Sequence, residues 1–169
     1  MRYFIGISAM ACLLSTSMGT ANAQAPKLDG SYNDWTSYSR ETGNDKSCYV
    51  ITKAKTTSPS SVRHGDVYFM ISNWRSGAAS EQPSFLTSYD LNPNIAPEAT
   101  VGSTKVGFYI ADNEAFIDES SDEKRLVRAM RAGSTMTVKA QSKRGTRVSY
   151  SFSLSGVTAA LKKAKEACR

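Results

Sequence analysis

The sequence predicts a mainly antiparallel β-sandwich or flattened barrel with two short helices, the second of them at the C-terminus. Three observations support this prediction. Apolar residues alternate with serine over residues 148–155, short runs of β-branched and aromatic residues are separated by turn residues, and only two stretches show helical spacing. Many short strands with few helices are typical of two packed antiparallel sheets.

The stretch VSYSFSLSG, residues 148–156, has the clearest strand pattern. Because successive side chains of a strand point to opposite faces, its apolar residues share one buried face and its serines share a wet one. Residues 136–140 alternate in the same way, and Lys143-Arg144-Gly145 between the two runs supplies a turn. We therefore expect an antiparallel hairpin over residues 135–154.

Three further runs, residues 48–52, 67–71 and 106–110, are nearly continuous in apolar residues. Such runs predict strands that are covered on both faces. Residues 34–35 and 84–89 are weaker strand candidates. The segment 73–104 contains Pro83, Pro93 and Pro97 among Ser, Asn and Gly, so we expect a loop there with at most one strand, over residues 85–89.

Two stretches have the apolar spacing of helices. In the first, residues 120–133, Ser120 and Glu123 form a capping-box pattern and Gly133 is a natural stop. In the second, after Gly156, apolar residues recur at helical spacing while lysines lie away from them. The apolar residues of this second helix are Val157, Ala160, Leu161, Ala164 and Cys168.

Residues 1–23 have the pattern of a secretory signal peptide, with Arg2, a short apolar run and an A-x-A site that predicts cleavage after Ala23. Cleavage leaves a single domain, residues 24–169, whose 20 bases and 15 acids give a net charge of +5. No later run is long enough to cross a membrane, so we expect no transmembrane segment in the mature protein and a location in the periplasm or at the cell surface. The sequence does not favour nucleic acid as a partner, because basic and aromatic residues do not interleave.

Two cysteines remain after the predicted cleavage, Cys48 and Cys168, 120 positions apart. Cysteines of an exported chain usually pair because the compartment is oxidising. Cys168 falls on the apolar side of the last predicted helix. A disulfide between these residues would therefore staple that helix to the strand that contains Cys48.

No pattern in the sequence predicts a catalytic residue, a metal site or a cofactor. His64 is the only histidine, a zinc site needs three or four ligands, and no serine lies in a G-x-S-x-G turn. We interpret His64 and Asp66 as a polar turn that enters the strand at Val67. The acidic residues between 112 and 123 lack calcium-loop spacing and are interpreted as a solvated loop before a helix.

The densest basic spot, Lys143 and Arg144 with Arg147 beyond them, is the first candidate contact region. It could hold anionic groups of an envelope or host-surface component, or it could only keep a hairpin tip soluble. Trp74 is the second candidate, as a recognition residue at a strand end, although it could instead fill the core.

Several motifs occur together over most of the mature chain: Asp34-Trp35, Cys48-Tyr-Val50, the run from Arg63 to Ile71, the run from Met130 to Val138, Ser142–Thr146, Ser153–Gly156, Thr158–Leu161 and Cys168. In this combination the chain resembles the invasion-associated locus B family of exported bacterial proteins. The resemblance implies a non-enzymatic periplasmic or surface protein, and some family members are linked to entry into host cells. Two alternatives stay open: an envelope-maintenance or stress component, and a glycan-acting enzyme that uses carboxylates such as Asp112 and Glu114. The oligomeric state is left open.

Overall fold

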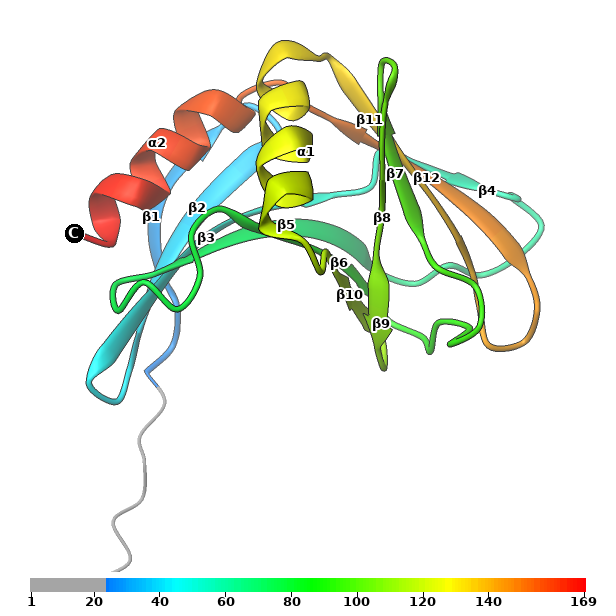
Figure 1. Ribbon diagram of the computed structural model, residues 1–169, viewed down its shortest axis with the longest axis horizontal. Coiled ribbons are helices and arrows are strands. Elements are labelled where there is room, and N and C mark those ends of the chain that lie inside the picture. The colour runs from blue at the N-terminus through cyan, green and yellow to red at the C-terminus, as the bar shows by residue number, and fades with distance from the viewer. Residues whose placement is uncertain (1–23) are drawn as a thin grey trace, which may run out of the picture.

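The computed structural model describes residues 24–169, so the predicted signal peptide and its cleavage site lie outside the described residues. The described chain forms a seven-stranded and a five-stranded antiparallel sheet with two helices (Figure 1). The predicted β-sandwich with a C-terminal second helix is confirmed. The flattened-barrel alternative is wrong, because each sheet is open and ends in two edge strands.

The seven-stranded sheet has the order β1-β2-β3-β5-β6-β10-β9, and the five-stranded sheet has the order β4-β12-β11-β7-β8. The first sheet contains β1 (Lys27–Tyr32), β2 (Trp35–Thr42), β3 (Asp45–Lys53), β5 (Val67–Trp74), β6 (Gln82–Thr87), β9 (Tyr109–Ala111) and β10 (Glu114–Phe116). The second contains β4 (Thr56–Ser58), β7 (Glu98–Val101), β8 (Thr104–Gly107), β11 (Thr135–Gln141) and β12 (Arg147–Ser153).

The predicted hairpin over residues 135–154 is confirmed as β11 and β12, which pair from Thr135 opposite Ser153 to Gln141 opposite Arg147. Its apolar face is buried and its serines are partly exposed, as the alternation requires. Tyr150 and Phe152 pack in the core between the sheets.

The predicted helices are α1 (Ser120–Ala132) and α2 (Val157–Ala167). The capping box expected at Ser120 is wrong, because the N-cap is Glu119 and no side chain caps the helix. Gly133 does end α1, with its N–H donating to the Ala129 carbonyl. A Cβ at Gly133 would lie 2.6 Å from Val101 Cγ1, so tight packing is what requires glycine there.

In the segment 73–104, where we expect a loop with at most one strand over residues 85–89, β6 is that strand, shifted by a few residues. The rest of the expected loop is too long, because β7 and the start of β8 also lie in this segment. Gly102, with φ of +56°, lies between β7 and β8 and allows a tight turn that the proline-rich context obscured. The single strand expected over residues 106–110 is also wrong. The chain leaves the second sheet at Gly107 and enters the first at Tyr109, with Phe108 buried between them.

Residues 24–169 cover only one face of the seven-stranded sheet, so the expectation that β3 and β5 are covered on both faces is wrong. Cys48, Val50, Phe69 and Ile71 point into the core toward the helices and the second sheet. Their neighbours along each strand are half-buried and lie on the opposite face. Figure 1 shows α1, α2 and the second sheet on the upper side of this sheet and no described element beneath it.

Candidate functional site

A cleft of about 700 Å³ lies between the β11–β12 turn, the segment before β5 and the segment after β6. Its main lining residues come from positions 62–65, 88–90 and 142–148. Three parts of the chain that are far apart in sequence therefore meet at the tip of this hairpin.

Hydrogen bonds hold the β11–β12 turn against the segment after β6. The Lys143 N–H donates to the Asp90 carbonyl at 2.9 Å, and Lys143 Nζ lies 3.4 Å from Asp90 Oδ2. Within the turn, the Gly145 N–H donates to the Ser142 carbonyl at 2.8 Å. These contacts place the basic tip at a defined position on the cleft wall.

The cleft has three cationic side chains and one carboxylate among its lining residues. The cations are Arg63, Lys143 and Arg144, and the carboxylate is Asp90. Asp90 is engaged with Lys143, which leaves Arg63 and Arg144 without a carboxylate partner among residues 24–169. An excess of positive charge in a concave site attracts anions and raises their local concentration.

A buried hydrogen-bonded chain lies beneath this charged surface. His64 Nε2 is 2.7 Å from the Pro59 carbonyl oxygen, and because a carbonyl only accepts, we assign the imidazole proton to Nε2. His64 Nδ1 then accepts from Tyr150 Oη at 3.0 Å, and Tyr89 Oη lies 2.6 Å from Tyr150 Oη. His64 thus lies in the polar segment that enters β5, as expected, and joins this segment to β12.

The His64 chain is arranged for structure and not for proton transfer to a ligand. Both imidazole nitrogens are engaged by protein groups, so neither is available to a substrate. Burial raises the pKa of Tyr150 far above its usual range. Burial also raises the pKa of Tyr89. These phenols therefore stay neutral in ordinary solution.

The structure brings Lys143 and Arg144 together and places Arg147 beside them. Arg147 lines a neighbouring hollow of about 390 Å³ that also contains Lys139 and Ile95. Trp74 does not join them, because it ends β5 whereas the cleft lies before the start of β5. Eight residues of extended strand separate the two ends by roughly 25 Å.

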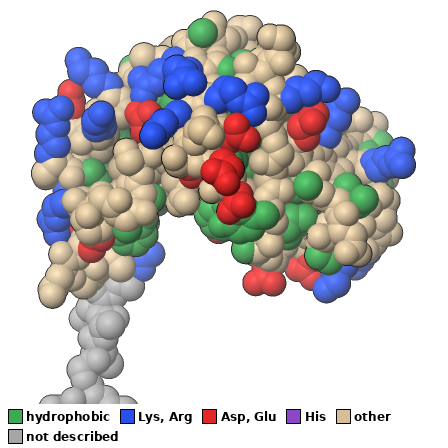
Figure 2. Space-filling view, in the orientation of Figure 1, with side chains coloured by type: hydrophobic (Ala, Val, Ile, Leu, Met, Phe, Trp, Pro, Cys, Tyr) green, Lys and Arg blue, Asp and Glu red, His purple; other side chains and the backbone are tan. Residues whose placement is uncertain are grey.

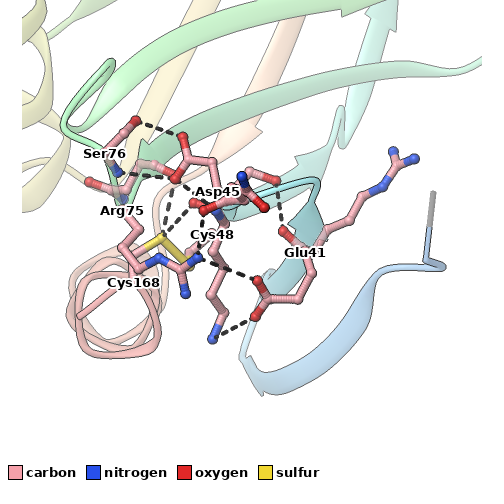
Figure 3. Close-up of polar contacts among 11 residues, drawn as sticks. Glu41, Asp45, Cys48, Arg75, Ser76 and Cys168 are labelled. Atoms are coloured by element: carbon pink, nitrogen blue, oxygen red, sulfur yellow. Dashed lines mark hydrogen bonds and ion pairs between the residues drawn. A yellow bond between two sulfur atoms is a disulfide. The ribbon is translucent and has the colours of Figure 1, made fainter. Parts of the chain in front are cut away.

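The end of β5 that carries Trp74 is next to the predicted disulfide, which joins Cys48 to Cys168 (Figure 3). Asp45 accepts hydrogen bonds there from the hydroxyl of Ser76 at 2.6 Å and from its N–H at 3.0 Å. These hydrogen bonds lower the pKa of Asp45, with the Ser76 hydroxyl making the largest contribution. The disulfide and Asp45 together connect α2, the β2–β3 turn and the loop after β5.

The acidic residues between 112 and 123 do not form a metal site. Among residues 24–169, no three His, Cys, Asp or Glu side chains are placed to hold a metal ion together. Asp112 lies in the turn between β9 and β10, Glu114 on β10, and Asp122 in α1, where it pairs with Arg125.

The described helices include none that is long and apolar enough to cross a membrane.

Sequence reasoning missed Arg63, Tyr89 and the link from His64 to Tyr150. Arg63 was visible as a base beside the only histidine. Tyr89 and Tyr150 carry no signal that they would meet, because they lie 61 positions apart and only the packing of the two sheets brings their hydroxyls together.

Comparison with known proteins identifies both a family and a fold. The family model described as "Invasion associated locus B (IalB) protein" matches residues 35–165. The crystal structure of invasion associated protein B from Bartonella henselae has a TM-score of 0.53 and 13% sequence identity, covering 85% of this chain and 98% of that chain. This likeness shows a shared fold. No curated protein matches the sequence.

Proposed function

Because this chain belongs to the invasion associated locus B family, we propose that it is an exported, non-enzymatic protein that acts by binding. The proposed partner is an anionic component of the bacterial envelope or of a host-cell surface, and binding would contribute to host-cell association. The leader pattern of residues 1–23 and the Cys48–Cys168 disulfide support export, since disulfides persist in oxidising compartments.

The observation that carries this proposal is the basic cleft at the β11–β12 tip. Arg63 and Arg144 extend the positive surface around Lys143, and one carboxylate partly offsets it. Guanidinium groups bind carboxylates, phosphates and sulfates through two parallel hydrogen bonds. A cleft with two such groups suits anionic substituents that project from a larger surface.

The chemistry of the cleft favours binding over catalysis. Its only histidine has both nitrogens engaged. The carboxylates of the enzyme alternative, Asp112 and Glu114, do not belong to the cleft lining. A glycan-acting enzyme would need two carboxyl groups facing one another across a bound sugar.

The test measures binding of oxidised protein, residues 24–169, to bacterial outer-membrane fragments and to erythrocyte membranes at about 20 and 150 mM salt. Binding should weaken at the higher salt because exposed charges are screened. Lys143→Ala/Arg144→Ala should weaken it roughly 2- to 30-fold at low salt, given about 0.2–1 kcal/mol for each exposed cation.

The matched control is Lys162→Ala/Lys165→Ala, which removes the same charge from exposed positions of α2. This control should bind like the parent protein. Binding that changes neither with salt nor in the Lys143/Arg144 variant would contradict the proposal. Capture of bacterial fragments alone would instead favour the envelope-maintenance alternative.

A further inference from the structure

The uncovered face of the seven-stranded sheet carries more apolar side chains than a solvated sheet face needs. Strand pairing places residues on this face in rows, such as Thr36, Ile51, Met70, Ser84, Phe116 and Tyr109 across six strands. The next row contains Tyr38, Tyr49, Ser72 and Gln82, and the row beyond it contains Arg40, Ser47 and Trp74. We call this surface the open face.

Six aromatic rings on five strands belong to the open face: Tyr38, Tyr49, Tyr68, Trp74, Phe116 and Tyr109. None of them is in the hydrophobic core or packed against it. Tyr38 and Tyr49 stack with ring centroids 5.6 Å apart, and Tyr109 is 49% exposed. Exposed apolar patches of this kind mark binding surfaces.

The shape of the open face restricts what can cover it. The sheet arches, with β2 and β3 descending on one side and β9 on the other (Figure 1), and Figure 2 shows that the molecule is hollowed on this lower side. A concave face cannot lie flat on a bilayer. Two copies facing one another would touch only at their rims. The occupant must therefore be convex or rod-shaped.

The polar side chains between the aromatic rings indicate which kind of rod-shaped partner the open face can bind. Thr36, Ser47 and Ser72 lie in the same rows as the aromatic residues. The apolar side of a protein helix would leave such groups unpaired, at a free-energy cost for each of them.

We infer that the open face binds a linear, uncharged glycan chain, with sugar rings stacked on its aromatic side chains and sugar hydroxyls bonded to the polar groups between them. A pyranose ring presents apolar C–H groups on its faces and hydroxyls around its edge, which matches this alternation. Charged residues are few in the paired rows of this face: Arg40, Asp45, Lys53 and Glu114. Lys53 is engaged by Asp66, and Asp45 is engaged by Ser76.

Four of the rings pack in pairs, Tyr38 with Tyr49 and Tyr109 with Phe116, before any ligand binds, which reduces the entropic cost of binding. Tyr49 lies on a central strand between β2 and β5 and stacks on Tyr38. Burial raises the pKa of Tyr49, so its hydroxyl stays protonated and able to donate to a sugar oxygen. This site is separate from the basic cleft, because Trp74 lies at the other end of β5.

The experiment titrates oxidised protein, residues 24–169, with cellohexaose, chitohexaose and maltohexaose. Trp35 is fully buried and Trp74 is only half-buried, so a saturable change in tryptophan fluorescence reports on Trp74. We expect saturable binding of at least one hexasaccharide with little dependence on salt. Calorimetry should show that Tyr49→Ala and Trp74→Ala each weaken it about tenfold, and that Tyr49→Phe, which keeps the ring, weakens it less.

Val62→Ala and Ile95→Ala are matched controls, because these exposed apolar residues lie off the open face. They should bind as the parent does, and so should Lys143→Ala/Arg144→Ala, which separates this inference from the proposed function. Melting curves check that each variant is folded. If Tyr49→Ala does not fold, Tyr38→Ala tests the same pair of stacked rings. No saturable binding of any of the three hexasaccharides, or equal weakening by the controls, would overturn the inference.

Discussion

Gly156 shows at the level of one residue how the regular stretch of β12 ends. Its φ is +92°, a conformation that side chains with a Cβ disfavour. A Cβ at this position would also lie 1.9 Å from the Tyr32 carbonyl oxygen. Glycine therefore allows the chain to turn from β12 into α2 and to pass directly against the backbone at the end of β1.

We expect Gly156→Ala to destabilise the protein by more than about 3 kcal/mol, since backbone strain and a backbone clash add together. Gly145→Ala is the control, because Gly145 has φ of +89° but open space around its Cβ position. It should cost only about 1–2 kcal/mol. Urea unfolding of the two oxidised variants measures the difference, and equal losses would show that the contact with Tyr32 does not matter.

The strands and helices show where local patterns suffice and where they do not. The β11–β12 hairpin follows from alternation alone, because one face packs in the core and the other is solvated. The continuous apolar runs of β3 and β5 wrongly predicted strands covered on both faces, because residues 24–169 leave the second face of these strands uncovered. The capping box at Ser120 failed because the helix begins one residue after Glu119 without a side-chain cap.

Asp45 connects the start of β3 to the loop after β5, and the strength of this connection depends on pH. Its carboxylate accepts from Ser76 and from the Lys46 N–H, and these bonds lower its pKa in the folded state. Its contribution to stability is therefore present above the ordinary aspartate pKa of about 4 and is lost as the pH falls through the lower folded pKa.

Asp45→Asn should consequently unfold at lower urea than the parent at pH 7, and the gap between their midpoints should shrink below pH 4. Ser76→Ala, which removes the main donor, should show the same shrinking gap. Ser80→Ala, at an exposed serine in the same loop, should match the parent at both pH values. A gap that stays constant from pH 7 to pH 3 would contradict this account of Asp45.

The Cys48–Cys168 disulfide acts on the whole molecule, because it closes a loop with a sequence separation of 120. A bridge of this span restricts the unfolded chain and stabilises the fold by roughly 4–5 kcal/mol on the chain-entropy account. It attaches the end of α2 to β3 of the larger sheet.

We expect a reducing agent to lower the urea midpoint of the parent protein and to speed amide exchange in α2. Cys48→Ala/Cys168→Ala should already have the lower midpoint and should not respond to the reducing agent. Measuring both proteins with and without the agent separates the disulfide from side effects of reduction. If reduction left the urea midpoint of the parent protein unchanged, the disulfide would not contribute to its stability.

The sequence by itself determined the fold class, the β11–β12 hairpin, the two helices and the pairing of the only two cysteines that follow residue 23, because these depend on local periodicity and composition. It also placed Lys143 and Arg144 at an exposed turn. Only the tertiary structure decided that Arg63 joins them, that Trp74 lies at the far end of β5 and that one face of the larger sheet is open. These features depend on how segments far apart in the chain pack together, and no local pattern encodes which apolar face a neighbouring element covers.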